Sequence, residues 1–280
     1  MNHTRIIDTI CALRWGSWCL VSLYISLLSG VIVGLQYNPS EPFYSVTAID
    51  LLVPYGAFFR SLHFYSSQGF FLFALIHFLC VYDATESYTF QSWLLLMITF
   101  PVIIFLLFTG YVLRGDNTGF SAGMIAEAIL LTIPFIGTLL NDLLFAVTEQ
   151  GMQRVYLHHV ISLDLLFLFL AWDHLRRYRV RVHDHIPFIC LTLLFCACIA
   201  APLEPERIGE SYIAGPWFFL GLQELLRYFH PLFAGVVYPL LFLTSLLSTH
   251  KSSRLLNASI NFSCCWLLLY LLLSIVAWIR

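Results

Sequence analysis

The chain has 280 residues, of which 60% are hydrophobic and 11% charged, with a mean hydropathy of +0.83 and a formal net charge of −2. Soluble domains usually carry about 25% charged residues, so this composition excludes an ordinary soluble protein. It predicts an all-α integral membrane protein with several spans. The near-neutral charge balance gives no indication of a nucleic-acid partner.

Seven apolar segments are long enough to cross a bilayer, which requires about 20 residues in a helix. Two longer connections separate some of them, and each contains a semi-apolar stretch interrupted by charge and proline. Such stretches are typical of helices that lie on the membrane surface. The predicted spans are 16–35, 60–82, 92–113, 155–176, 187–202, 231–249 and 262–279, and the connections are 115–153 and 203–229.

Basic residues predict the orientation of the chain. Loop 176–185 reads RRYRVRVHDH, loop 249–254 reads THKSSR, and Arg5 and Arg14 precede the first span. Counting spans places all three regions on one side, which the positive-inside rule makes cytoplasmic. We therefore expect a cytoplasmic N-terminus, an outer C-terminus and outer-side surface helices, in a bacterial-type inner membrane or a thylakoid-like membrane.

Two predicted spans each carry a pair of histidines. His63 and His77 are fourteen residues apart, and His159 and His174 are fifteen apart, which corresponds to about 21 and 22 Å along a helix. Both spans begin on the outer side, so matched depth pairs His63 with His159 near the outer surface. The same argument pairs His77 with His174 near the inner surface.

Two imidazoles at one depth suit a haem iron with two axial histidine ligands, a centre that carries electrons. The histidines therefore predict two stacked haems, with His63 and His159 on the outer iron and His77 and His174 on the inner iron. The chain contains no CxxCH motif for c-type haem attachment. The alternative is four buried polar residues satisfied by neighbouring helices, but ionisable groups within spans are costly and usually functional.

Other residues in these spans fit the same interpretation. Arg60 and Arg154 lie at the predicted outer edge, where haem propionates require cations; the alternative is snorkelling at the interface. Gly16 and Gly30 are also fourteen residues apart, and a missing side chain at each depth lets a porphyrin approach the backbone. Close packing of helices through small residues explains the glycines equally well.

The chain contains five short motifs: RSLH at 60–63, GVIVGLQYNP at 30–39, GYVL at 110–113, IPFIG at 133–137 and R.Y..H at 154–159. Together these motifs resemble cytochrome b of the quinol-oxidising cytochrome bc and bf complexes, closest to the chloroplast and cyanobacterial branch. The resemblance covers most of residues 1–180 and implies a four-helix bundle with two haem b groups and quinone chemistry. Residues 181–280 are similar to a three-span part that is a separate subunit in chloroplasts, so two fused domains are expected, 1–180 and 181–280.

The chain also departs from the family pattern at several positions. The glutamate of the family's PEWY segment, which accepts a proton from quinol, falls at Pro216, and the LPW turn is replaced at 113–115 by LRG. Leu96 stands where the family has a second glycine. Arg14 stands where the chloroplast branch has a haem-tethering cysteine, so no third haem is expected. Asp164 replaces a proline.

Glu127, Glu224 and Asp164 remain as candidate proton acceptors. Each glutamate could equally be a solvated charge on a surface helix. Placing an acid at the depth of Asp164 in a membrane costs free energy. Asp164 could act as a proton relay, pair with a buried cation or face a water pocket, and the sequence does not choose between these roles.

On the inner side, Arg179 matches an arginine that the family places near the inner haem and the inner quinone site. The neighbouring run His183, Asp184, His185 offers groups that exchange protons near neutral pH. An exposed loop without such a role is the plainer alternative.

The sequence thus predicts a di-haem b-type subunit of a multi-subunit complex, which could be dimeric, that moves electrons between the quinone pool and an outer-side cytochrome c or iron–sulfur subunit. A linear conduit is favoured slightly over bifurcated quinol oxidation because of Pro216. One alternative is a haem-bearing membrane anchor without a quinone site. Another, from a different class, is a proton-conducting transporter, which would show no b-type haem spectrum.

Overall fold

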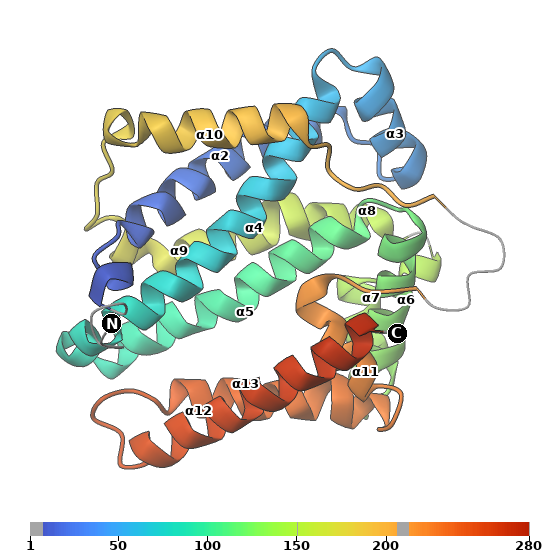
Figure 1. The fold of residues 1–280 in the computed structure, drawn as a ribbon. Helices are drawn as coiled ribbons and strands as arrows, with labels where there is room; N and C mark the ends of the chain where they lie inside the picture. The colour runs from blue at the N-terminus through green and yellow to red at the C-terminus, as the bar shows by residue number, and fades with distance from the viewer. Residues whose placement is uncertain (1–7, 150, 206–212, 280) are drawn as a thin grey trace. The chain divides into compact units, whose positions relative to one another are not determined.

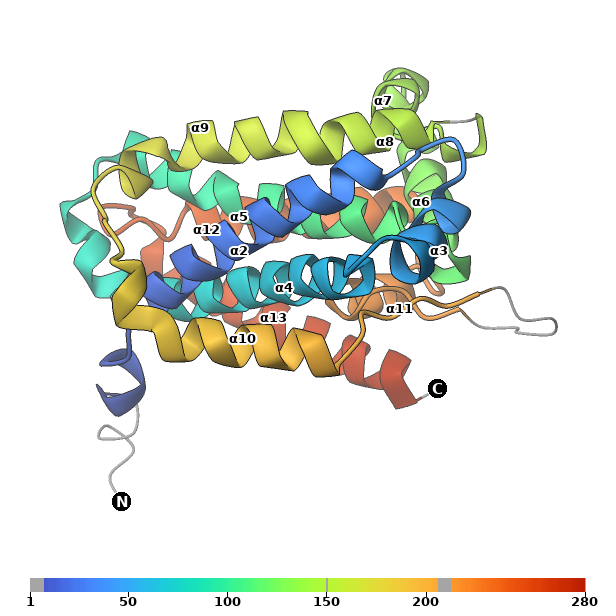
Figure 2. The same cartoon turned by 90° about the horizontal axis from the view of Figure 1, so that it is seen from above.

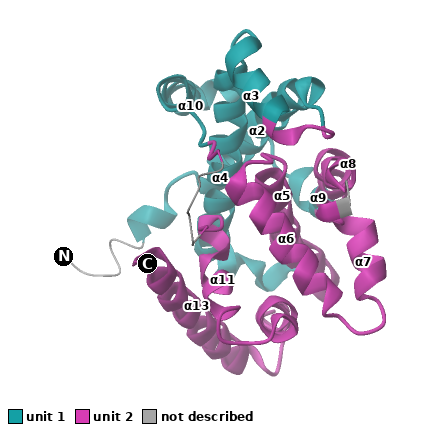
Figure 3. Ribbon diagram, turned by 90° about the vertical axis from the view of Figure 1, so that its right-hand side faces the viewer, with its two compact units in different colours: residues 1–38, 44–88, 171–202 teal, residues 39–43, 89–170, 203–280 magenta. Residues whose placement is uncertain are grey.

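The protein is described by a computed structural model over residues 8–149, 151–205 and 213–279, and this part of the chain contains helices and no strand (Figure 1). Two compact units can be distinguished, and each is assembled from segments that are distant in sequence (Figure 3). The first unit comprises residues 1–38, 44–88 and 171–202. The second comprises residues 39–43, 89–170 and 203–280.

Five helical segments among the described residues are long and apolar enough to cross a membrane. They are α2 (Trp15–Gln36), α4 with η1 (Gly56–Val81 and Tyr82–Ser87), α5 (Phe90–Val112), the continuous run α8, η3 and α9 (Met152–Leu157, His158–Ser162 and Leu163–Leu175), and α13 (Leu256–Ile279).

Two further apolar segments are shorter. They are η4 with α10 (Val182–His185 and Ile186–Cys198) and η6 with α12 (Leu232–Val237 and Tyr238–Leu247). All seven predicted segments are therefore helical, and the all-α membrane fold is confirmed.

The connections between spans also contain helices, as expected for surface elements. Asp116 caps the N-terminus of the helix Asn117–Leu131, because its Oδ1 accepts a hydrogen bond from the Gly119 amide at 2.8 Å. These elements are α3 (Pro42–Leu52), α6 (Asn117–Leu131), α7 (Gly137–Leu144), η2 (Val147–Glu149), η5 (Trp217–Phe219) and α11 (Leu220–Leu225).

In the first unit, α2 packs along α4 (Figure 2). Small residues line this contact: a Cβ added to Gly69 of α4 would lie 3.7 Å from the Ser22 hydroxyl of α2. Buried serines satisfy their own hydroxyls, since Ser29 and Ser66 each donate to the carbonyl four residues earlier at 2.6 Å. Small residues let helix backbones approach closely in a membrane, where apolar surface gives no driving force between helices.

A disulfide between Cys11 and Cys80 joins the segment before α2 to the end of α4 within the first unit. Most cysteines are expected from the sequence to act as small hydrophobes, and the six others are free. The bond links residues 69 positions apart, so only the packing of α2 on α4 brings the two thiols together.

In the second unit, α11 packs on α13, where Gly221 lies against the backbone: a Cβ there would be 2.8 Å from the Tyr270 carbonyl oxygen. Tyr238, Trp266 and Tyr270 form a stack with centroid separations of 4.5 and 5.0 Å. Aromatic rings bury large areas at such contacts, so this stack joins α12 to α13.

Candidate functional site

His63 is held on α4 by two contacts from α2. Its Nδ1 donates to the Ser26 carbonyl oxygen at 2.9 Å, and a Cβ added to Gly30 would lie 2.8 Å from the ring. A proton on Nδ1 leaves the lone pair on Nε2, and this kind of hydrogen bond fixes the tautomer and orientation of a metal-binding histidine. The local packing therefore prepares His63 as a ligand.

His77 and His174 lie close together within the first unit, with ring centroids 6.2 Å apart. A metal–imidazole nitrogen distance is about 2 Å, so two rings bound to opposite sides of one iron have centroids roughly 6 Å apart. The separation fits the predicted inner haem. Gly16 makes room for His77, since a Cβ would lie 2.9 Å from its ring, and the Tyr88 hydroxyl lies 3.3 Å from His174 Nδ1.

His159 belongs to the second unit, where α5 contacts its ring. A Cβ at Gly110 would lie 2.9 Å from the imidazole, and the Thr109 hydroxyl lies 3.0 Å from Nδ1. Thr109 donates its proton to the Phe105 carbonyl oxygen at 2.8 Å, so its oxygen accepts from His159 Nδ1. His63 lies in the first unit, and the pairing of His63 with His159 stays a prediction.

The helix around His159 is π-helical over His158–Ser162, not α-helical. His158 stabilises this segment: its Nε2 donates to the Leu143 carbonyl oxygen at 2.9 Å and its Nδ1 accepts from the Ser162 hydroxyl at 3.1 Å. A π turn closes i→i+5 bonds and so contains one extra residue. It absorbs one residue of the fifteen-residue spacing from His159 to His174.

Three glycines, Gly16, Gly30 and Gly110, thus share one role, which is to admit the edge of an imidazole ring. The predicted approach of the first two to a porphyrin stays a prediction. Sequence reasoning missed Gly110 as a site residue, although a signal was present: it lies fourteen residues after Leu96, the position where the family has its other glycine.

Arg60 has partners within the protein. It is buried, and its Nε and Nη2 bind the two carboxylate oxygens of Asp50 at 2.6 and 2.5 Å, while Nη2 also donates to the Ala201 carbonyl oxygen at 2.8 Å. This bidentate pair neutralises the guanidinium, so a propionate would share it with Asp50. Arg154 is exposed on the last turn of α8. Both propionate roles stay predictions.

Glu127 is buried on α6 and fully engaged. Its carboxylate accepts hydrogen bonds from Asn141 Nδ2 at 3.0 Å and from the hydroxyl and amide of Thr148 at 2.9 and 3.2 Å. Burial acts to raise the pKa of Glu127, but these hydrogen bonds outweigh it and lower the pKa below its usual value. Glu127 is therefore a weak base that fastens α7 and the segment before α8.

Glu224 is 1% exposed on α11 and accepts a hydrogen bond from the Tyr228 hydroxyl at 3.0 Å, with the Arg227 guanidinium 3.9 Å away. Pro216 lies in extended backbone just before η5. Gln223 holds this segment, since its Oε1 accepts from the Gly215 amide and its Nε2 donates to the Ile213 carbonyl oxygen, both at 2.7 Å. Glu224 is thus a buried acid close in sequence to the altered position.

The turn at 113–115 reads LRG where the family has LPW, and its arginine forms an ion pair. Arg114 is buried, binds Asp116 and stands 4.5 Å over the Tyr111 ring. Asp116 also accepts from the Glu204 amide at 2.8 Å. The pair therefore fastens the start of the 203–229 connection to the end of α5.

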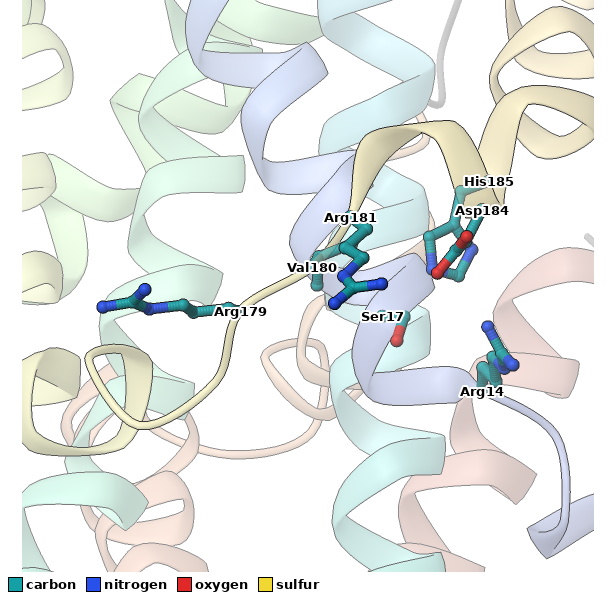
Figure 4. Close-up of a pocket in the computed structure, with 7 residues that line it drawn as sticks. All are labelled: Arg14, Ser17, Arg179, Val180, Arg181, Asp184 and His185. Atoms are coloured by element: carbon teal, nitrogen blue, oxygen red, sulfur yellow. The ribbon is translucent and has the colours of Figure 1, made fainter.

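The remaining candidates lie in α9 and beyond it. Asp164 is half-buried in the first turn of α9 and has no hydrogen-bond partner among the described residues. Arg179 lines a cavity near the start of α10, together with Asp184 and His185 (Figure 4). His183 Nε2 lies 2.9 Å from Asp184 Oδ1.

Comparisons with known proteins agree with this arrangement. Residues 5–181 match the family model described as cytochrome b/b6/petB. Cytochrome b6 of Heliobacterium modesticaldum is 28% identical over 173 residues, 59% of this chain and 81% of that protein. Cytochrome b of Python regius is 29% identical over 254 residues, 76% and 68% of the two chains.

Among solved structures, a chain of a hyperthermophilic respiratory Complex III is similar in fold. The TM-score is 0.66 at 20% sequence identity, and the match covers 94% of this chain and 88% of that one. The family model spans well over half of the residues, including all four histidines of the two helices. The chain belongs to the cytochrome b/b6 family.

Proposed function

We propose that the protein is a di-haem cytochrome b that moves electrons across the membrane between the quinone pool and an outer-side redox partner, within a multi-subunit quinol oxidoreductase complex. The observation that carries the proposal is the 6.2 Å separation of the His77 and His174 rings in the first unit. That separation suits two ligands of one iron, and the family binds haem b.

When bound, haem b would supply a one-electron carrier. The chain's own groups hold the imidazoles in a ligating orientation. The Ser26 carbonyl and the Thr109 hydroxyl each accept from an Nδ1–H, and such bonds raise the basicity of the ligating nitrogen. His63 and His159 are proposed for the outer site, and His77 and His174 for the inner site.

Glu224 is the better candidate for the outer-side proton acceptor. Glu127 accepts several hydrogen bonds that lower its pKa, so it is a poor base. Glu224 is buried and lies eight residues after Pro216.

A linear electron path is favoured because Pro216 stands where the family has an acid. Quinone would then react near the inner haem or at an altered outer site. His183 and Asp184 would then exchange protons on the inner side, and the role of Asp164 stays open.

The partner is proposed to be a cytochrome c or an iron–sulfur protein on the outer face. The basic loops 176–185 and 249–254 support a cytoplasmic inner face, with the N-terminus inside and the C-terminus outside. Residues 181–280 are proposed as a three-span domain fused to the haem domain of residues 1–180.

The haem count is tested with the full chain purified in detergent. We expect two b-type haems per protein by reduced-minus-oxidised spectroscopy. His63→Ala and His77→Ala should each lose one haem, and the double variant should lose both. His183→Ala, an exposed histidine outside the two helices, is the control and should keep two. A wild-type protein with one haem or none contradicts the proposal.

The quinone reaction is tested separately by following haem reduction after quinol is added. Glu224→Gln should slow reduction at least tenfold, whereas Glu127→Gln should change it less than twofold. If no quinol reduces either haem in the wild type, the chain is a haem-bearing anchor and not a quinol-reactive subunit.

A further inference from the structure

The Cys11–Cys80 disulfide lies next to His77, a ligand proposed for the inner haem. Cys80 follows His77 by three residues, which places both on one face of α4. Cys11 precedes Gly16 by five residues, and the missing side chain of Gly16 admits the His77 ring. The bond therefore joins the segment before α2 to the end of α4 close to the contact at His77 (Figure 1).

Reagents in the aqueous phase can reach this bond. Cys11 is exposed, and Cys80 is partly buried near the end of α4. Residues 8–14 are exposed throughout, and the Trp15 indole donates back to the Ile10 carbonyl oxygen at 2.7 Å. A thiolate breaks a disulfide by attacking one of its sulfur atoms, so an exposed sulfur is open to attack. The bond can therefore be reduced while the protein is folded.

The packing of α2 on α4 continues beyond the bond. The rings of Trp15 and Trp18 contact that of Phe73 on α4, with centroids 5.8 and 6.1 Å apart, and the two helices pack along each other. Reduction should therefore release the exposed segment 8–14 and leave the helices assembled. The two thiols then stay near each other, and the bond can form again.

The predicted surroundings of the bond favour a reversible role. The basic loops predict that this end of α4 faces the cytoplasm, where glutathione and thioredoxin-type dithiols keep thiols reduced. Disulfides in that compartment are usually transient, catalytic or redox-sensing. The six other cysteines are free, so the Cys11–Cys80 bond is not part of a wider disulfide framework.

We propose that Cys11 and Cys80 form a redox modification site that adjusts the inner haem. A thiolate of a dithiol reductant attacks the exposed Cys11 sulfur, and the Cys80 thiolate leaves and takes up a proton. The second thiol of the reductant then displaces Cys11. The reductant becomes a disulfide, and its two electrons and two protons pass to the two cysteines.

Reduction acts on the haem site through the released segment. The start of α2 is then held less firmly, so Gly16 no longer fixes the position of the His77 ring. The reducible pair does not depend on the haems, whereas its effect on the inner haem rests on the proposed function.

Reducibility is tested with the full chain in detergent, before and after incubation with dithiothreitol. Free thiols are blocked with iodoacetamide, the protein is denatured and reduced, and the remaining cysteines are labelled with N-ethylmaleimide and counted by mass spectrometry. We expect Cys11 and Cys80 to react with iodoacetamide only after dithiothreitol treatment, and to do so together. Cys19, which is buried and free, should stay unlabelled in both samples and thereby show that the protein is folded. A bond that dithiothreitol reduces only after unfolding would overturn the proposal.

Release of the segment is tested by trypsin cleavage after Arg14, an exposed residue. Cleavage should become about tenfold faster or more on reduction, because proteolysis follows local opening. Cys11→Ser and Cys80→Ser should be cleaved fast with or without dithiothreitol. Cys190→Ser, which removes an exposed free cysteine from α10, should behave like the wild type. Equal cleavage of the oxidised and reduced wild type would overturn the proposal.

The effect on the haem is tested by redox titration of oxidised and reduced protein, both alkylated so that the bond cannot form again. Reduction should shift the midpoint potential of the haem that His77→Ala removes and leave the other unchanged. Cys11→Ser should have the shifted value under both conditions. Two haems with potentials that do not respond to reduction would overturn the effect on the inner haem. A wild-type protein without haem would instead contradict the proposed function, and labelling and cleavage would still decide whether the pair is reducible.

Discussion

The two histidine-bearing helices solve one geometric problem in different ways. α4 is regularly α-helical, and its histidines, His63 and His77, are fourteen residues apart. The run from Met152 to Leu175 separates His159 and His174 by fifteen residues and contains a π-helical segment at His158–Ser162. The extra residue and the π turn occur together, and we infer that one compensates for the other.

The angular arithmetic supports this inference. At 3.6 residues per turn, fourteen residues end about 40° short of four full turns, whereas fifteen end about 60° beyond them. A π turn holds one more residue than an α turn, which returns the second pair to the offset of the first. Both helices can then present two imidazoles on one face, and the second can do so only through its bulge.

The largest expected effect comes from deleting one residue inside or outside the bulge. Deleting Val160 should convert the π turn to an α turn and leave His159 and His174 fourteen residues apart on one face. Deleting Leu168, in the α-helical part, should leave the bulge in place and turn one histidine about 100° away from the other. We expect two haems per protein for the Val160 deletion and one for the Leu168 deletion, by reduced-minus-oxidised spectroscopy.

The matched change in α4 is the insertion of one alanine after Phe71, which gives a fifteen-residue spacing without a π turn. This insertion should also remove one haem. If the Val160 deletion loses as much haem as the Leu168 deletion, the bulge does not compensate for the longer spacing.

The ends of the two helices that are nearer to His63 and His159 are anchored by different chemistry, and this predicts the next effect. Arg60 of α4 pairs with Asp50, whereas Thr148, just before α8, is held by the Glu127 carboxylate. The hydrogen bonds that lower the pKa of Glu127 stabilise the fold above the unfolded-state pKa of about 4.3, and this contribution is lost as the pH falls through the lower folded-state pKa.

Glu127→Gln should therefore reduce stability at pH 7 by about 2 kcal/mol, because an amide NH₂ would face the Asn141 and Thr148 donors. It should also abolish this component of acid destabilisation below about pH 4. Thermal unfolding in detergent between pH 7 and about pH 3.5, followed by circular dichroism, measures both effects. If the stability of the wild type and of Glu127→Gln falls equally steeply as the pH is lowered, the pH dependence comes from other groups.

Much of this comparison is accessible from the sequence. Hydropathy predicts the first span at 16–35, and α2 runs from Trp15 to Gln36; it predicts the second at 60–82, and α4 begins at Gly56. Long apolar runs are decided locally by the need to satisfy the backbone inside a bilayer. The four histidines are identifiable for the same reason, since a polar residue in such a run stands out.

The rest depends on contacts between distant segments or on irregular backbone. Arguments from periodicity assume 3.6 residues per turn, so they do not predict the π turn at His158–Ser162. The one indication of it in the sequence is the fifteen-residue spacing of His159 and His174, which is one residue longer than that of His63 and His77. The partners of Glu127 lie fourteen and twenty-one residues away. The Cys11–Cys80 bond joins residues 69 positions apart, and in the sequence a cysteine cannot be distinguished from a small hydrophobic residue that packs without forming a bond.

The hydrogen bonds made by the Nδ1 atoms of His63 and His159 predict that the two histidines differ in their sensitivity to substitution of the neighbouring residue. His63 donates to a backbone carbonyl, that of Ser26, which a substitution does not remove, whereas His159 donates to the Thr109 side chain. Thr109→Val should lower haem affinity at the His159 site about tenfold, which is typical for the partner of a metal-binding histidine. Ser26→Ala should change the His63 site less than threefold, as measured by haem titration of the apoprotein. Comparable losses in both variants would mean that the Ser26 carbonyl does not hold His63 independently of the Ser26 side chain, and that the proposed asymmetry is wrong.

The smallest expected effect tests what maintains the bulge. His158 bonds the Leu143 carbonyl oxygen and the Ser162 hydroxyl, and its side chain is partly exposed, so His158→Ala should reduce stability by about 1 kcal/mol. If these bonds hold the π turn, the variant should also shift the midpoint potential of the haem at His159 and leave that at His77 unchanged in a redox titration. His183→Ala, which removes an exposed histidine from a loop, should shift neither. A stability loss without a change in potential would mean that the fifteen-residue spacing, rather than His158, is sufficient to keep the π turn in place.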